Sequence, residues 1–254
     1  MSSEADLLGE FEEHSPAGIR AVLAAGVSPT APIDGKRPID VLIEMYLRSS
    51  RFVECLQVTL DAGAELGDPL LEAVLLDDDA GLRRPLSGSS ENLHRKLNPL
   101  CAFTSCRGVS ALHICAEFNS TRCARVLLDT GADVNARADR DADGVGGQTP
   151  IFHAVNSIFN YCGPMMEILV DAGADLDLRV RSLLWGESMN RETVVYDSHS
   201  HFLRSVRSLP AVSSARGGCL QQHRIPVSQA LRQGGAVPER AQQVPRCRAL
   251  AGAA

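Results

Sequence analysis

The stretch GVSALHICAEFNSTRCARVLLDTGADVNA (108–136) decides the fold of this chain. It opens on a turn glycine, continues through two short apolar segments and reaches a second glycine, Gly131, after which the chain leaves in extended form. Glycine adopts the left-handed backbone conformation that terminates a helix at little steric cost. The stretch therefore predicts two consecutive helices, the second of which ends at Gly131.

The same pattern recurs along the chain. Helix endings like the one at Gly131 are found at VLAAGVSP (22–29), TLDAGAEL (59–66) and LVDAGADLDL (169–178). Helix starts like the one at Gly108 are found at GKRPID (35–40) and GGQTPIFHA (146–154). Pro38 and Pro150 suit the first turn of a helix, where a missing N–H is not lost. Self-similarity of this kind is the sequence signature of a repeat array.

A degenerate repeat is expected between Gly63 and Gly131, because these glycines lie about two repeat lengths of roughly 33 residues apart. Its first helix is expected at 68–79 and its second within 91–103. The intervening GLRRPLSGSS (81–90) has the glycine, proline and serine content of a loop.

These segments resemble the ankyrin motif G-x-T-P-L-H-x-A, followed by a second helix and a G-A-D-V-N-A ending. The resemblance implies an all-α fold: an ankyrin-repeat solenoid of about five helix-pair repeats joined by hairpin fingers. It covers most of 4–197, and the approximate repeats are 4–30, 34–66, 67–106, 107–136 and 146–179. In such a repeat an imidazole supports a turn, and we assign this role to His113.

The chain departs from the motif at several positions. Ser110, Ala111 and Cys115 replace the family's Thr, Pro and Ala, and Phe152 stands where His113 stands in the preceding repeat. In the second repeat Arg37 and Asp40 replace Thr and His, so the hydroxyl-to-imidazole contact is lost there and we expect a less rigid repeat.

The last part of the chain, 198–254, differs in composition from the rest. It carries eight arginines and a single acidic residue, Glu239, in a protein of net charge -6. Few aromatic residues and no sustained apolar period predict a basic, disordered tail. An arginine-rich tail also supports the alternative function, nucleic-acid binding, which would depend strongly on salt.

The tail begins where a further repeat is due. Suitable codons for DSHSHFLRSVRSLPAVSSARGGCLQQHRI (197–225), read one nucleotide later, spell THTPISYAQFGLFPQFHRHEEDVYSNI, which opens like an ankyrin helix start. We therefore interpret 198–254 as an out-of-frame reading, a hypothesis that the coding DNA decides.

No catalytic, cofactor or metal site is expected. The sequence has no G-x-S-x-G, H-E-x-x-H or S-x-x-K motif. DRDADG (139–144) opens like a calcium loop, but Pro150 occupies the position of the closing carboxylate, so we interpret it as a solvated acidic finger. The scattered cysteines and the acidic N-terminus, which lacks the features of a secretory signal, predict free thiols and a cytoplasmic protein without a membrane span.

The resemblance implies that the chain is a protein-protein interaction module, an adaptor or scaffold that is not an enzyme, and that it binds its partner through its concave face and fingers. The acidic finger favours a partner protein with a basic patch. We also weigh the alternative that Phe118 and Phe159 pack into neighbouring repeats. The candidate partner-binding residues are Arg107, Glu117, Phe118, Asn119, Asp139, Asp141, Asp143, Asn156, Ser157, Phe159, Asn160 and Tyr161.

Overall fold

The structure is a computed structural model of the whole chain. It describes residues 2–178, except 46, 89, 100, 102–105, 143, 145 and 156–160, together with 180–185 and 193–198. The predictions for Asp143, Asn156, Ser157, Phe159, Asn160 and the tail beyond Ser198 lie outside the described residues.

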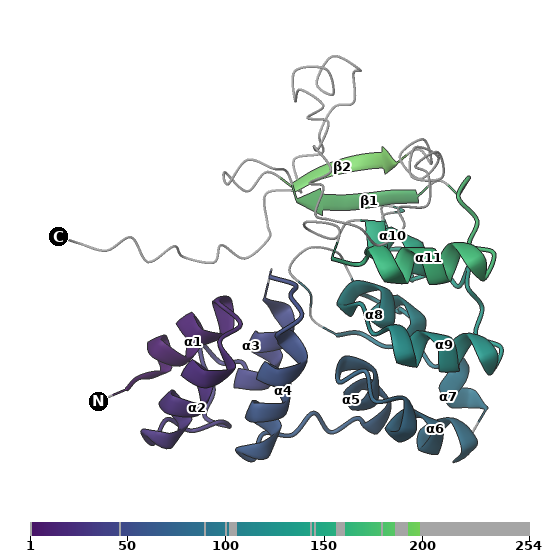
Figure 1. Cartoon of the computed structure of the whole chain (residues 1–254). Helices are drawn as coiled ribbons and strands as arrows, with labels where there is room; N and C mark the ends of the chain where they lie inside the picture. Colours follow the sequence, from purple (N-terminus) through teal and green to yellow (C-terminus); the bar gives the residue numbers. More distant parts are fainter. Residues whose placement is uncertain are drawn as a thin grey trace, which may run out of the picture. The chain divides into compact units, whose positions relative to one another are not determined.

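In the part of the chain that the structure describes, five helix pairs follow one another (Figure 1). The first helices of the pairs are α1 (Glu4–Glu12), α3 (Pro38–Glu44), α5 (Pro69–Leu75), α8 (Ala111–Phe118) and α10 (Pro150–Val155). The second helices are α2 (Pro16–Ala24), α4 (Phe52–Asp61), α6 (Asp79–Gly88), α9 (Thr121–Asp129) and α11 (Gly163–Asp171). Each expected repeat range contains one pair, and the helical fold class is confirmed.

The helix boundaries follow the chemistry expected from the sequence. Pro38 and Pro150 are the first residues of α3 and α10. The glycines that follow α4 and α9, Gly63 and Gly131, have φ angles of 102° and 98°. A side chain is strained in this left-handed region, so glycine ends these helices at the lowest cost.

The third pair differs from the sequence-based expectation. The segment 81–90 was predicted to be a loop, but most of it belongs to α6. Among the described residues of 91–103, the single turn α7 (Glu91–His94) is helical. Two features explain α6: the Asp78 side chain accepts a hydrogen bond from the Gly81 N–H at 3.0 Å, and Leu82 is completely buried. The loop prediction was wrong because burial of Leu82 favours the helix despite Pro85 and the glycines.

The helices pack in two rows. Among the first helices, α5 packs on α8 and α8 on α10, whereas α6 packs on α9 and α9 on α11 among the second helices. The core is continuous along the array; in α9 it contains Cys123, Ala124, Val126 and Leu127.

The regular packing is interrupted between the second and third pairs. Within the described part of the chain, neither α3 nor α4 has an extensive helix-to-helix contact with α5, α6 or α8. The second pair instead contacts the fourth: the Phe52 ring at the start of α4 lies 4.7 Å from the Phe118 ring at the end of α8, measured between centroids. Buried side chains therefore connect the two parts of the array where helix stacking is sparse.

A strand pair that the sequence analysis did not predict follows the last helix. β1 (Val180–Trp185) pairs antiparallel with β2 (Thr193–Ser198), with Val180 opposite Ser198. These strands occupy the end of the range that was assigned to the repeat array.

Candidate functional site

Two hairpin fingers flank the first helices of the fourth and fifth repeats. In the 95–110 finger Leu97 and Val109 form a β-bridge, and in the 130–149 finger Arg140 and Gly146 form another. The fingers are joined by a backbone hydrogen bond from the Asp139 N–H to the Arg107 carbonyl, at 3.1 Å. The two fingers therefore form one connected surface.

Lys96 reinforces this connection. Its Nζ donates to the Gly108 carbonyl at 2.8 Å, to the Arg137 carbonyl at 2.7 Å and to Oδ1 of Asp139 at 3.0 Å. One side chain thus ties together the backbones of both fingers. Sequence reasoning missed Lys96, because nothing in the motif marks this position.

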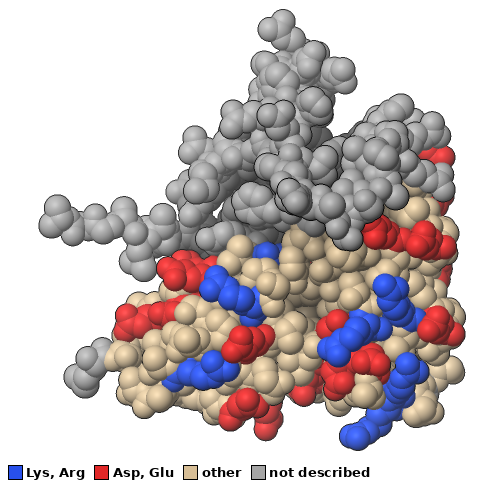
Figure 2. All heavy atoms as spheres, in the orientation of Figure 1, with Lys and Arg blue, Asp and Glu red and all other residues tan. Residues whose placement is uncertain are grey.

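The charge of the 130–149 finger is mixed and not simply acidic. Asp139 is exposed but paired with Lys96, and the neighbouring Arg107, Arg137 and Arg140 are also exposed. Asp141 is half-buried. The face drawn in Figure 2 likewise shows acidic and basic side chains interspersed. The expectation of a solvated acidic finger therefore holds only in part.

His113 plays the structural role assigned to it. Its Nδ1 accepts a hydrogen bond from the Ser110 N–H at 3.1 Å and lies 2.8 Å from the Ser110 hydroxyl, while Nε2 donates to the Gln148 carbonyl at 3.0 Å. Burial and the nearby His153 lower the pKa of His113 to about 3. The neutral imidazole therefore fastens its own turn to the next finger.

The second repeat achieves the same connection with different chemistry. Nε and Nη2 of Arg37 donate to the two carboxylate oxygens of Asp40 at 2.6 and 2.7 Å, and Nη1 donates to the Glu65 carbonyl at 3.1 Å. Arg37 thus binds within its own turn and to the next finger, as His113 does. The hydroxyl-to-imidazole contact is absent here, as expected, and a bidentate ion pair takes its place. The lower rigidity expected of this repeat stays a prediction.

In the described part of the fifth repeat, no side chain at the motif histidine position bonds the hydroxyl of the turn. Phe152 occupies the position of the motif histidine, and the buried hydroxyl of Thr149 has no hydrogen-bond partner among the described residues.

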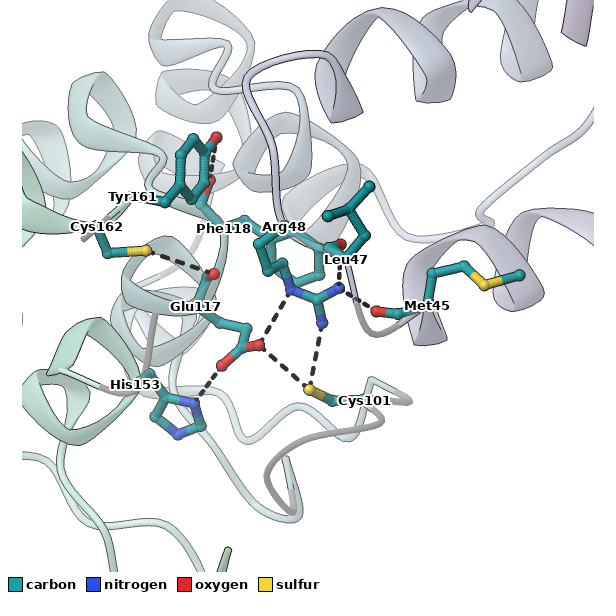
Figure 3. A network of polar contacts seen from close by, with 9 residues as sticks. All are labelled: Met45, Leu47, Arg48, Cys101, Glu117, Phe118, His153, Tyr161 and Cys162. Carbon is teal, nitrogen blue, oxygen red and sulfur yellow. Dashed lines mark hydrogen bonds and ion pairs between the residues drawn. The ribbon is translucent and has the colours of Figure 1, made fainter. Parts of the chain in front are cut away.

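Glu117 and Phe118 lie inside the fold and not on an accessible binding surface. Only 5% of each residue is exposed. Oε1 of Glu117 accepts from Nε of Arg48 at 3.1 Å, and Oε2 accepts from Nδ1 of His153 at 3.0 Å (Figure 3). The guanidinium carbon of Arg48 lies 4.3 Å from the centroid of the Phe118 ring. The alternative that Phe118 packs against neighbouring repeats is the arrangement observed.

We call Arg48, Cys101, Glu117, Phe118 and His153 the Arg48 cluster. Arg48 lies in the loop between α3 and α4 and also donates to the Met45 and Leu47 carbonyls. Its Nη2 lies 3.3 Å from Sγ of Cys101, which in turn donates to Glu117 at 3.3 Å. Burial alone would raise the pKa of Glu117, but the hydrogen bond from His153 and the charge of Arg48 lower it to about 2. Glu117 is therefore an ionised structural carboxylate.

Asn119 and Tyr161 lie beside this cluster. Asn119 ends α8 in a left-handed conformation with φ of 58° and is half-buried. The Tyr161 hydroxyl donates to the Phe118 carbonyl at 3.5 Å, and burial raises the pKa of Tyr161 to about 12. Among the predicted site residues that are described, Arg107 and Asp139 are exposed, and Asn119, Asp141 and Tyr161 are partly so.

Two negative findings concern only the described residues. Within them, no group of three or more histidine, cysteine or acidic side chains is arranged to hold a metal ion. No helix in the same part of the chain is long and apolar enough to cross a membrane.

Comparison with known proteins supports the repeat interpretation. Residues 71–180 match the family model described as ankyrin repeats in three copies. The crystal structure of the human ASB11 ankyrin repeat domain is similar at 20% identity, covering 81% of this chain and 84% of that chain with a TM-score of 0.33. No curated protein matches the sequence. Residues 71–180 of this chain are ankyrin repeats.

Proposed function

We propose that this protein is a cytoplasmic adaptor that binds another protein through the fingers and first helices of its fourth and fifth repeats. Ankyrin repeats generally mediate protein-protein interaction and are typically not enzymes. The observation that carries the proposal is the connected surface of the two fingers, on which exposed Arg107 and Asp139 lie next to each other.

The pre-organisation of this surface favours binding. Lys96 and His113 fix the fingers through the Gly108, Arg137 and Gln148 carbonyls. A surface that is already ordered loses less conformational entropy on association, so more of the interaction energy contributes to affinity.

The charges suggest the chemistry of the partner. Asp139 and Asp141 favour a basic patch opposite the 130–149 finger, whereas exposed Arg107 favours an acidic group beside that patch. Such alternating charges fix how the partner is aligned on the surface, and they accelerate association at low salt.

Two matched charge-reversal variants test whether the partner binds at the finger surface. Arg107→Glu alters the finger surface, and Arg125→Glu makes the same charge change on an exposed position of the second helix α9. In quantitative affinity capture, Arg107→Glu is expected to lose partners that both the wild-type protein and Arg125→Glu retain. Loss of the same partners only with Arg125→Glu would place binding on the opposite helices and refute the proposal.

The arginine excess of 198–254 supports the second candidate, nucleic-acid binding. A salt titration of binding to a DNA duplex, with and without 198–254, separates the two. Affinity that falls steeply with salt and requires the tail would favour nucleic acid; duplex binding that is weak and independent of the tail would leave the protein-binding proposal.

A further inference from the structure

Two arginine side chains of the 130–149 finger meet at a single glycine. Nη1 of Arg137 donates a hydrogen bond to the Gly147 carbonyl at 3.2 Å. A Cβ atom added to Gly147 would lie only 2.5 Å from Nε of Arg140, so the absence of a side chain there leaves the space that Arg140 occupies. Both guanidinium groups therefore gather beside the same residue, and both arginines are exposed.

The described part of the chain supplies no acidic partner for either arginine. The neighbouring Asp139 is turned toward the other finger, where Lys96 binds its carboxylate at 3.0 Å and a Cβ atom added to Gly108 would overlap it. Two like charges that gather in one place repel each other, and an anion bound between them relieves the repulsion. The two arginines are therefore complementary to an anionic group from outside the described chain.

The free edge of Arg137 suits a carboxylate. Within the described residues Arg137 uses only Nη1, which leaves Nε and Nη2 for a ligand. Nε and Nη2 form a planar fork that matches the two oxygens of a carboxylate. Arg37 holds the Asp40 carboxylate with this same pair of nitrogens, at 2.6 and 2.7 Å. The chain thus already contains one example of the contact that Arg137 can make.

The surrounding charges favour a carboxylate over a phosphate. Exposed Asp139 and half-buried Asp141 belong to the same finger as the two arginines. They repel a phosphate, which carries nearly two negative charges, more strongly than a carboxylate, which carries one. The site therefore selects a singly charged anion.

We propose that Arg137 and Arg140 form a carboxylate-binding site that takes an aspartate or glutamate side chain of the partner protein. This inference rests on the proposed function, because it specifies the chemistry of the partner at the finger surface. The basic patch expected opposite Asp139 and Asp141 would flank this acidic side chain, in keeping with the mixed charge of the finger.

A synthetic peptide tests the site before the partner is identified. The probe is a fluorescent peptide of alternating glutamate and glycine, and the control peptide has glutamine in place of glutamate. Fluorescence anisotropy measures the affinity of each peptide for the full chain at low salt, where screening is weak. We expect the glutamate peptide to bind several-fold more tightly than the glutamine peptide.

Matched variants locate the bound peptide. Arg137→Gln and Arg140→Gln should each weaken binding of the glutamate peptide several-fold, whereas Arg125→Gln, on the exposed side of α9, should leave it unchanged. The Arg140 side chain makes no hydrogen bond or ion pair within the described residues, so its replacement leaves the contacts of the fold in place. Arg137→Lys keeps the charge but loses the planar fork, and it should bind the peptide more weakly than the wild-type protein.

Two results would overturn the proposal. An affinity that neither glutamine variant changes would assign the peptide to other cations, such as the arginines of 198–254. Tighter binding of a phosphoserine peptide than of the glutamate peptide, lost in both variants, would show that the site takes a phosphate. Because the peptide experiment needs no partner, its failure is distinct from failure of the proposed function, which the capture experiment with Arg107→Glu decides.

Discussion

Nε of Arg48 and Oε1 of Glu117 lie 3.1 Å apart in a buried ion pair that joins the loop after α3 to the end of α8. The side chains of the two residues are only 4% and 6% exposed. The pair therefore connects the second repeat to the fourth at the place where the regular helix stacking is interrupted.

Removing one member of this ion pair should lower the free energy of unfolding substantially. Arg48→Met leaves the Glu117 carboxylate buried without its guanidinium partner, and an unpaired buried charge destabilises a fold by about 3–5 kcal/mol. We expect a loss of this size in the free energy of unfolding, measured by urea denaturation followed by circular dichroism. The double variant Arg48→Met/Glu117→Gln should recover part of it, since no unpaired charge remains. Strict additivity of the two single variants would contradict the ion pair.

The low pKa of Glu117 predicts acid sensitivity. Its pKa falls from the ordinary 4.5 to about 2 in the fold. A depressed carboxylate pKa contributes stability that is present above the unfolded-state pKa and lost as the pH falls through the folded-state pKa. The shift corresponds to a contribution on the order of 3 kcal/mol. Unfolding free energies measured between pH 5 and pH 2 should fall less steeply in Glu117→Gln than in the wild-type protein.

Buried His14 predicts a second pH dependence at higher pH. Its Nδ1 lies 2.8 Å from the Ser49 hydroxyl, and burial, with the charges of Arg48 and Arg51, lowers its pKa to about 4. A histidine with a lowered pKa binds a proton more readily in the unfolded chain, so stability is full above the ordinary pKa of 6.5 and falls as the pH decreases toward 4.

His14→Asn isolates this effect, because asparagine tolerates the positive φ of 47° at this position. The dependence of unfolding free energy on pH between 6.5 and 4 should become shallower by up to about 1.4 kcal/mol per pH unit. Exposed His94 provides the control, and His94→Asn should leave the slope unchanged. Equal slopes in all three proteins would refute the role of His14.

Removing the hydroxyl group should change the stability of the protein differently at two equivalent motif positions. The Ser110 hydroxyl lies 2.8 Å from Nδ1 of His113, so Ser110→Ala should cost about 1 kcal/mol. The Thr149 hydroxyl has no partner among the described residues, so Thr149→Val should be neutral or stabilising. Differential scanning calorimetry of both variants measures the contrast, and an equal loss of stability in the two would contradict it.

The local pattern of this sequence predicted the repeats well. The turn glycines, Pro38, Pro150 and the contact between Ser110 and His113 follow from chemistry within a few residues of each position. The helix α6 was missed because its stability depends on tertiary burial of Leu82, which outweighs a proline in the helix.

The Arg48 cluster could not be predicted for the same reason. Arg48 and Glu117 are far apart in sequence, and a charged residue at a variable motif position is usually solvated. Phe118 and Glu117 were both predicted to bind a partner, with core packing as the alternative for Phe118, and both are buried. The partners of Glu117 come from other repeats, so the motif does not reveal its burial. The out-of-frame interpretation of 198–254 stays a prediction, which the coding DNA tests.

The reactivity of the chain's two lysines tests the central claim most directly. Lys36 lies in the turn before α3 and Lys96 in the 95–110 finger, and their side chains are 46% and 50% exposed. The measurement is the rate of amine acylation at each lysine, by mass spectrometry of the full chain with and without a captured partner. Binding through the fourth and fifth repeats predicts that the partner slows acylation of Lys96 several-fold more than that of Lys36. Unchanged reactivity at Lys96, together with slowed amide exchange confined to α6, α9 and α11, would contradict the account.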